Sequence, residues 1–366
     1  MIQYLKLGSL TRIRTGKLDA NAADDNGTYP FFTCSREPLS INTCSYDCEC
    51  VLVAGNGDLN VKYYDGKFDA YQRTYIIESL DKTKLMVKYL YYFLDLYVEI
   101  LRQQAIGGVI KYIKLGNLAD AIIPVPVIEK QREIIEIFEK CNGTIAYRQQ
   151  ELLLMDQLVK SRFIEMFGDP KRNPRKWDMV TVGDIATDVR YGTSRPATEG
   201  GKYPYLRMNN LTYEGYLDLT DLKHIDIPDN EVEKCVVRNG DVLFNRTNSV
   251  ELVGKTCVYN LDSDMIIAGY IIRVRIDDRV LPVILSSYLN STVMKEQLRS
   301  MAKGAVNQAN INAQELRSIP IYLPPITLQH EFATFVEQVD KSKFEIQQSL
   351  EKLEILKKSL MQQYFG

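Results

Sequence analysis

Two stretches of the chain, residues 126–168 and 324–366, place apolar side chains at intervals of three, four and seven residues. This spacing brings them to one face of an α-helix and, when it is sustained, is typical of a coiled-coil seam. A helix of about 37 residues is roughly 55 Å long and cannot bury such a seam alone. The predicted seam residues are Ile134, Phe138, Ile145, Leu152, Met155 and Val159 in the first stretch and Phe332, Val336, Val339, Ile346, Leu350, Leu353 and Leu360 in the second.

The two stretches are copies of one another. A shift of 198 residues places residues 126–131 on 324–329 and continues without a gap to Gly168 and Gly366. Such self-similarity predicts a tandem repeat whose two helices pair with each other. A surface coiled coil that only joins domains is one alternative. A membrane-surface helix is a weaker one, because the polar faces mix charges of both signs.

Short apolar runs bounded by turn residues fill the regions before the two helices. Residues 50–54, for example, read Cys-Val-Leu-Val-Ala and lead directly into the turn Gly-Asn-Gly-Asp. Runs of this kind predict β-strands, and shorter helices are expected near residues 82–102 and 282–301. Each half of the chain is therefore expected to be a mixed α/β globule followed by a long helix, which gives an α+β fold class.

The domain boundaries follow from this layout. We place the globules at residues 1–120 and 169–314 and the helical regions at 121–168 and 315–366. Residues 168–177, between the first helix and the second globule, are polar, basic and rich in proline. This composition is typical of a solvated linker, and contact with a phosphate backbone is the alternative.

The charge distribution leaves room for a nucleic-acid surface. The chain has 45 basic and 47 acidic residues, and a net charge of −2 is unusual for a nucleic-acid binder. Residues 1–120, however, hold 14 basic and 14 acidic residues, and residues 169–314 hold 19 of each. The acidic excess therefore lies in the helical repeats, and a balanced globule can still present a basic groove.

Both globules contain side chains suited to such a groove. Arginine, asparagine and glutamine can pair with base edges, and hydroxyl groups donate to phosphates. For any one of these residues, a solvated loop is the alternative interpretation. The candidates are Arg12, Arg14, Lys17, Arg36, Asn56 and Arg73 in the first globule, and Tyr191, Thr193, Arg195, Arg207, Asn209, Asn210, Arg246, Asn248, Lys303, Asn307 and Gln308 in the second.

The sequence predicts no catalytic residues. His224 and His330 are the only histidines, and no Ser-His-Asp or Cys-His motif surrounds either of them. Gly55-Asn56-Gly57 lacks the third glycine of a dinucleotide fingerprint, and no phosphate-binding loop occurs. The Asn/Asp-Pro-Pro-aromatic motif of amino-methyltransferases is also missing.

We expect neither a metal site nor a membrane span. Cys34, Cys44, Cys48 and Cys50 lack the paired spacing of zinc ligands, so reduced thiols are the preferred interpretation over zinc. No run of 18 uncharged apolar residues occurs, and the first ten residues do not resemble an export signal. A cytoplasmic location is therefore expected.

Several motifs together resemble the specificity subunit of type I restriction-modification systems. Residues 123–131 and 319–329 resemble the family's proline-rich lead into its conserved helices. Residues 167–177 resemble its crossing into the second recognition domain, and residues 240–246 a recurrent strand of those domains. The resemblance covers nearly the whole chain.

The resemblance implies a non-catalytic, DNA-reading subunit. Each globule would be a target recognition domain that reads one half of an asymmetric, bipartite sequence in double-stranded DNA. The two helices would form an antiparallel coiled coil that fixes the gap between the half-sites. They would also dock two methylation subunits. S-adenosylmethionine, ATP and Mg would be bound by partner subunits, which could include restriction subunits.

Two other classes of function stay open from the sequence. One is a DNA-binding protein that acts alone, as a repressor or an architectural factor. The other is a scaffold that recruits partner helices and binds no nucleic acid.

Overall fold

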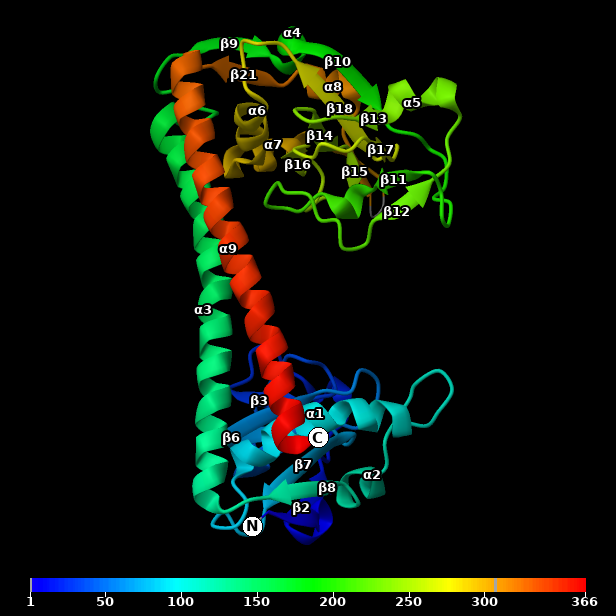
Figure 1. Cartoon of the computed structure of the whole chain (residues 1–366), viewed down its shortest axis with the longest axis vertical. Helices are drawn as coiled ribbons and strands as arrows, with labels where there is room; N and C mark the ends of the chain where they lie inside the picture. The colour runs from blue at the N-terminus through cyan, green and yellow to red at the C-terminus, as the bar shows by residue number, and fades with distance from the viewer. Residues whose placement is uncertain (1, 306–307) are drawn as a thin grey trace. The chain divides into compact units, whose positions relative to one another are not determined.

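The computed structural model describes residues 2–305 and 308–366, without the side chains of 303–305, and divides the chain into two compact units (Figure 1). Unit 1 comprises Met1–Gln149 and Gln347–Gly366, and unit 2 comprises Gln150–Ile346. Both divisions fall inside the long helices α3 (Ile128–Phe167) and α9 (Ile326–Phe365). Each unit therefore contains one globule together with one part of each long helix.

A six-stranded sheet in the order β2-β7-β5-β6-β3-β4 forms the globule of unit 1. Its neighbours are antiparallel except for β3 and β6, which run parallel. Its strands are β2 (Thr11–Thr15), β3 (Tyr29–Phe32), β4 (Leu39–Ile41), β5 (Tyr46–Ala54), β6 (Val61–Ala70) and β7 (Thr74–Ser79). The other elements are the strand pair β1 (Gln3–Lys6) and β8 (Ile122–Val125), helices α1 (Val87–Gln104) and α2 (Leu115–Ala119), and the 3₁₀ turns η1 (Leu7–Ser9) and η2 (Ala20–Ala22).

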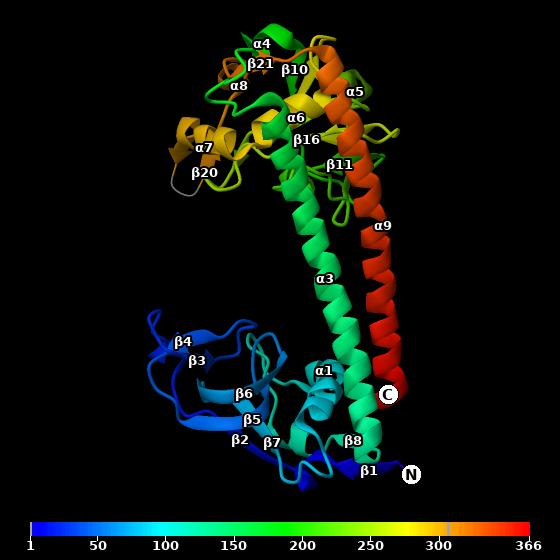
Figure 2. The same ribbon diagram turned by 90° about the vertical axis from the view of Figure 1, so that its left-hand side faces the viewer.

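Helix α1 joins the sheet of unit 1 to the long helices. Successive side chains of a strand point to opposite faces, and Val51 and Val53 of β5 pack in one core cluster with α1. Figure 2 shows α1 between the sheet and α3. The ring of Phe138 in α3 packs against Tyr92 of α1, with ring centroids 4.7 Å apart, and stacks on Phe365 of α9 at 6.0 Å. The last turn of α9 is therefore part of the core of unit 1.

Unit 2 is built from smaller sheets, ordered β10-β18-β14-β16, β12-β11-β17-β13 and β15-β20-β19, and the pair β21-β9. Its strands are β9 (Asp178–Thr181), β10 (Ala186–Tyr191), β11 (Tyr203–Leu206), β12 (Lys223–Ile225), β13 (Val236–Val237), β14 (Val242–Asn245), β15 (Thr247–Asn248), β16 (Thr256–Val258), β17 (Met265–Ile267), β18 (Ile271–Ile276), β19 (Lys303–Ala305), β20 (Gln308–Asn310) and β21 (Pro320–Leu323). Its helices are α4 (Val182–Ile185), α5 (Asp229–Cys235), α6 (Pro282–Asn290), α7 (Thr292–Met301) and α8 (Ala313–Arg317), with the 3₁₀ turn η3 (Met208–Asn210).

The core of unit 2 also draws on both long helices. Phe163 and Phe167, near the end of α3, lie 5.5 and 5.4 Å from Phe332, in the second turn of α9. Farther along the same helices, Lys343 donates to Asp156 at 2.5 Å. The end of one helix thus meets the start of the other in each unit, and the two helices are antiparallel there.

The two globules share one strand topology. The antiparallel pairs β2–β7 and β7–β5 of unit 1 have counterparts in β10–β18 and β18–β14 of unit 2. The parallel pair β3–β6 corresponds to β11–β17, and the pair β1–β8 to β9–β21. Sequence comparison of the two halves revealed the repeat only in the long helices, from residues 126–168 to 324–366. The tandem repeat includes the globules as well as the helices.

The side chains of the predicted seam are shielded from solvent. All thirteen predicted seam side chains are buried or half-buried. The most enclosed are Ile134, Phe138 and Phe332, which are exposed by 2% or less. A helix that hides one stripe and exposes the rest is held mainly by tertiary packing, which agrees with a seam shared by α3 and α9.

One buried glutamine fastens the first turn of each long helix to its globule. Gln131 accepts from the amide of Met86 at 3.0 Å and donates to the carbonyls of Lys84 and Pro126. Gln329, its copy in the repeat, accepts from the amide of Leu281 at 2.8 Å and donates to Arg279 and Pro324. Both side chains are fully buried. Because buried polar groups are costly to leave unpaired, each glutamine fixes where its helix begins.

Replacing Gln131 by alanine is expected to destabilise the protein by about 1–3 kcal/mol, because buried amide and carbonyl groups lose their partner. Urea unfolding of the whole chain measures the change. Gln103→Ala, at an exposed position near the end of α1, is the matched control and should change stability by less than about 0.5 kcal/mol. Equal effects of the two substitutions would contradict the fastening role.

Candidate nucleic-acid interface

In unit 1, five segments meet at one end of the sheet. We call them the first junction; they are the segment after β2, the segment after β3, the turn after β5, the β6–β7 turn and the segment before α2. Backbone hydrogen bonds of 2.8 to 3.1 Å join them, from the amides of Gly16, Lys17, Tyr71, Gly55 and Ile113 to the carbonyls of Thr74, Ala70, Phe32, Arg73 and Gly55. A Cβ on Gly16 would lie 2.1 Å from the Ala70 oxygen, and one on Gly55 would lie 2.3 Å from the Arg73 oxygen. Glycine is required at both positions because the backbones approach so closely.

The first junction brings together some of the predicted contact residues. Lys17, Asn56 and Arg73 lie on its loops, and the amide of Gly55, next to Asn56, donates to Arg73. In the described parts of the chain, neither Lys17 nor Arg73 makes an ion pair, and both are exposed. Their charges are therefore available to a ligand. Arg36 is exposed as well but pairs with Asp58 at 3.0 Å.

Arg12 and Arg14 lie outside the first junction, on strand β2. Arg14 pairs with Glu78 at 2.8 Å and lies over the ring of Tyr46 at 4.7 Å. Arg12 is exposed and stands opposite Glu78 in the sheet. The contacts of Arg14 are those of a residue that stabilises the sheet.

Unit 2 builds the same junction with different side chains. We call it the second junction. Its hydrogen bonds, of 2.9 to 3.1 Å, run from the amides of Gly192, Thr193, Ala268, Arg246 and Ile311 to the carbonyls of Ile271, Ile267, Leu206, Tyr270 and Arg246. A Cβ on Gly192 would lie 2.1 Å from the Ile267 oxygen, as at Gly16. The two sets of bonds match one to one, and they equate Lys17 with Thr193 and Arg73 with Tyr270.

Aromatic and basic side chains dominate the second junction. The guanidinium of Arg246 lies 4.8 Å from the ring centre of Tyr191. Tyr191 accepts from the amide of Ala313 at 2.8 Å. Asn248, on β15, pairs with the strand that contains Gln308, and Gln308 is exposed. These four predicted residues therefore lie on one connected framework with Thr193.

Two predicted arginines on neighbouring loops are already paired. Arg195 makes a bidentate contact with Glu231, at 3.1 and 2.8 Å, and hydrogen bonding to Glu231 raises the pKa of Arg195. Arg207 pairs with Asp221 at 2.7 Å. A ligand would have to compete with these carboxylates.

Asn210 was predicted to contact DNA, but the structure places its side chain in the interior. It is 2% exposed, accepts from the amide of Arg207 at 2.8 Å and donates to the carbonyl of Asp218 at 2.7 Å. These contacts hold the loop in place and leave no group for a base. Asn209 beside it is exposed. Asn307 lies outside the described residues, as does the side chain of Lys303.

Sequence reasoning missed two residues of unit 2. Tyr270 is 48% exposed at the β17–β18 turn, where Arg73 stands in unit 1. Lys255 is buried and donates to the carbonyl of Met208 at 2.8 Å, so it supports the turn that carries Asn209. Burial lowers the pKa of Lys255. Tyr270 follows Ala268-Gly269, a turn signal in the sequence, whereas nothing in the sequence marks Lys255 as buried.

The cysteines of the first globule differ in their exposure to solvent. Cys50 is buried, and burial raises its pKa and that of Cys48. Cys44 is exposed. Within the described parts of the chain, no three side chains of metal-binding type gather around a common point. Both histidines are exposed.

Among residues 2–305 and 308–366, no helix combines the length and the apolar character needed to cross a membrane.

Comparison with known proteins identifies the family. The chain matches the type I restriction modification DNA specificity domain over residues 2–154 and 174–357. It is 37% identical over 156 residues to the EcoDI specificity subunit of Escherichia coli. This alignment covers 43% of this chain and 34% of that protein. It is 23% identical over 261 residues to the EcoKI specificity subunit of Escherichia coli strain K12, covering 67% and 56%. These alignments span about a third to a little over half of the relatives' length.

A solved structure agrees in fold. The S subunit of the type I restriction-modification system from M. genitalium superimposes with a TM-score of 0.59 at 16% identity, covering 100% of this chain and 96% of that one. The chain thus belongs to the type I restriction-modification DNA specificity family. The family that the helix motifs indicated is confirmed.

Asn210→Ala is expected to destabilise unit 2 by about 1–3 kcal/mol, because the amide of Arg207 and the carbonyl of Asp218 lose their partner. Chemical denaturation measures this, with Asn209→Ala as the exposed neighbour for comparison. If Asn210→Ala lowered DNA affinity without loss of stability, the residue would have to be a contact residue after all.

Proposed function

We propose that this chain is the DNA-recognition subunit of a type I restriction-modification complex, in which each globule reads one half of a bipartite, asymmetric target. One observation carries the proposal: the same backbone junction occurs in both units with different side chains on it. A shared framework docks on the same features of a duplex, while the side chains differ in the bases that they accept. Two different readers on one chain favour a target with two different halves.

The chemistry of the junctions suits DNA. In unit 1, Lys17 and Arg73 offer exposed charges, and Asn56 offers an amide beside them. Lysine and arginine bind phosphates and guanine edges, and asparagine pairs with adenine. In unit 2, Tyr191, Tyr270 and Arg246 offer rings and a guanidinium. This local arrangement provides for DNA binding in spite of the net charge of −2.

The long helices serve as the spacer between the two readers. Each continues without a break from one unit into the other. Forty residues of helix measure about 60 Å, and one turn of DNA about 34 Å. We infer that helix length sets the gap between the half-sites. In this proposal, residues 1–120 and 169–314 are the recognition domains, and 121–168 and 315–366 are the helical regions.

The outer faces of the helices provide docking surfaces for methylation subunits. Leu158 is 50% exposed on α3, and Leu356, its copy in the repeat, is 48% exposed on α9. Leu154 and Ile355 are exposed nearby on the respective helices. Exposed apolar side chains of this kind mark protein contacts. The duplication of Leu158 as Leu356 in the repeat supports two methylation subunits for each chain.

Catalysis then belongs to the partners. The methylation subunits would bind S-adenosylmethionine, and restriction subunits, where present, would bind ATP and Mg. This chain would contribute recognition and assembly in the cytoplasm. A DNA-binding protein that acts alone and a scaffold without nucleic acid are the two rivals, and no observation on this chain favours either.

Co-expression with the neighbouring methylation subunit in a methylation-free host tests the proposal. Single-molecule sequencing should reveal a bipartite motif with methylated adenine in both halves. A soluble complex that leaves the genome unmodified would favour the rivals. The salt dependence of DNA affinity then separates those two, because phosphate contacts make it steep.

Arg73→Ala and Tyr270→Ala are expected to act on opposite halves of the target. Each should lower affinity by about 1–3 kcal/mol and relax base preference in one half only, because one reader loses a contact. Binding to a library of variant duplexes provides the measurement. Arg12→Ala, away from the junction, should change little. Relaxation of both halves by one substitution would contradict the assignment of one junction to one half.

Removal of one heptad from both α3 and α9 is expected to shorten the gap by about three base pairs, because seven residues of helix span about 10 Å. The half-sites should stay the same, since the junctions are untouched. Methylation mapping of the variant provides the measurement. An unchanged gap would contradict the proposal that helix length sets the distance between the half-sites.

A further inference from the structure

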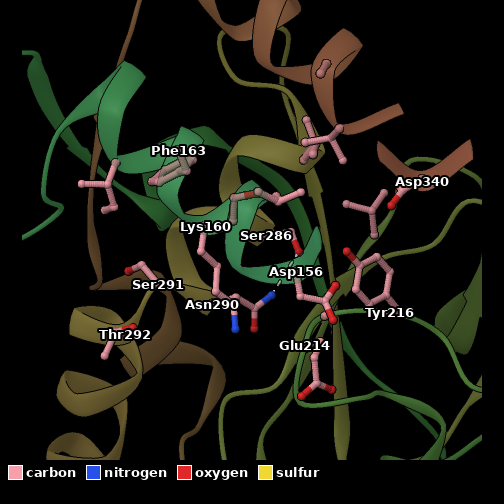
Figure 3. A pocket seen from close by; sticks show the side chains of 18 of the residues that line it. Asp156, Lys160, Phe163, Glu214, Tyr216, Ser286, Asn290, Ser291, Thr292 and Asp340 are labelled. Atoms are coloured by element: carbon pink, nitrogen blue, oxygen red, sulfur yellow. Dashed lines mark hydrogen bonds between the residues drawn. The ribbon is translucent and has the colours of Figure 1, made fainter. Parts of the chain in front are cut away.

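Unit 2 contains a cavity of about 450 Å³ where its globule meets the long helices. Figure 3 shows side chains of α3, of α6 and of the loop that carries Glu214 and Tyr216 around it. Its apolar wall includes Val159 and Phe163 of α3 and Val336 of α9. The recognition junction described above does not use this space.

Two serines explain why the cavity exists. The buried glutamines equate Met86 with Leu281, so Tyr91 and Tyr92 of α1 correspond to Ser286 and Ser287 of α6. In unit 1, Tyr92 fills the space against the long helix and packs against Phe138. In unit 2, both serines line the cavity instead. Unit 2 thus has two serines where unit 1 has two aromatic rings.

The cavity is also acidic. Asp156, Glu214, Glu337 and Asp340 line it, and Lys343 pairs with Asp156 at 2.5 Å. Oδ1 of Asp340 is buried and has no hydrogen-bond partner among the described residues. Lys160 is a lining cation. More carboxylates than cations therefore face the space, and a buried acceptor there lacks a donor.

Two of the equivalent positions in unit 1 already have partners. Glu139, the copy of Glu337, pairs with Lys88 at 2.5 Å. Asn142, the copy of Asp340, donates to the hydroxyl of Tyr92 at 3.4 Å. The two units therefore differ at these positions, since the side chains of unit 1 have partners where those of unit 2 line a cavity.

Exposed apolar side chains extend the cavity wall along both helices. On α9, the lining residues Glu337 and Asp340 continue at helical spacing to Phe344, which is 64% exposed. On α3, the row through Lys160 and Ile164 continues in the other direction to Leu153, which is 62% exposed. A free cation would need no such apolar surface, whereas a protein segment with apolar and basic residues would cover it.

We propose that this cavity receives a lysine or arginine side chain from an amphipathic segment of one methylation subunit. The carboxylates bind the charged head, the walls of Val159, Phe163 and Val336 bind the aliphatic stem, and Leu153 and Phe344 contact apolar neighbours on the same segment. Because the lining carboxylates are negatively charged, they would repel a DNA phosphate, so DNA is not the proposed occupant. The proposal rests on the proposed function, and it makes the two methylation subunits unequal, because in unit 1 the ring of Tyr92 packs against Phe138 at the corresponding place.

Two kinds of variant test it in the co-expressed complex. Ser287→Tyr introduces the ring that unit 1 has at this position, and Glu337→Gln with Asp340→Asn removes two of the lining carboxylates at nearly constant shape. Glu139→Gln in unit 1 is the matched control. Native mass spectrometry across a salt series counts the methylation subunits per chain. Thermal unfolding of each variant, and its DNA affinity without partners, are measured alongside.

We expect the wild type and Glu139→Gln to retain two methylation subunits at salt concentrations at which Ser287→Tyr and the double variant Glu337→Gln/Asp340→Asn retain only one. The affinity for the second subunit should fall about 30-fold, the loss typical when one partner of a buried charge pair is removed. If Ser287→Tyr does not fold, the charge variant decides. Retention of two subunits by the charge variant, or loss of both, overturns the proposal, as does reduced DNA affinity of the isolated chain. A wild type that binds no methylation subunit at all contradicts the proposed function itself.

Discussion

Each long helix has an apolar row that it cannot bury by itself, and the rest of the molecule is arranged around this constraint. The start of α3 and the end of α9 complete the core of unit 1, where Phe138, Tyr92 and Phe365 pack together. The end of α3 and the start of α9 do the same in unit 2, through Phe163, Phe167 and Phe332. Neither globule has a complete core without both helices, so the stability of each unit depends on residues from distant parts of the sequence.

The repeat separates what must stay constant from what can differ. Gln131 and Gln329 fasten the helices by the same three hydrogen bonds, and the two junctions are held by matching backbone bonds. Backbone groups and buried amides make these contacts, so they are insensitive to the exposed side chains beside them. Lysine and arginine in one junction can therefore be threonine and tyrosine in the other without a change of fold.

The two long helices could be predicted from the sequence because an apolar period of three and four residues is a local signal, and a gapless shift of 198 residues shows that the two stretches are copies. The common topology of the globules could not. Gly16 corresponds to Gly192, a shift of 176, whereas Arg73 corresponds to Tyr270, a shift of 197. Insertions accumulate between these positions, and strand pairing is a long-range property that no short window contains. Asn210 was misjudged for a related reason, since burial by its own loop is invisible in its flanking residues.

Phe365 lies in the core of unit 1 although it is the second-last residue of the chain, and this affects how the protein folds during translation. A ribosome makes the strands of unit 1 first and residues 347–366 of the same unit only after all of unit 2. The apolar surface around Phe138 and Tyr89 that Phe365 covers must therefore stay open while more than half of the chain is still being made. Nascent chains in such a state expose surfaces that aggregate or recruit chaperones. The first half to be translated is thus among the last to finish folding.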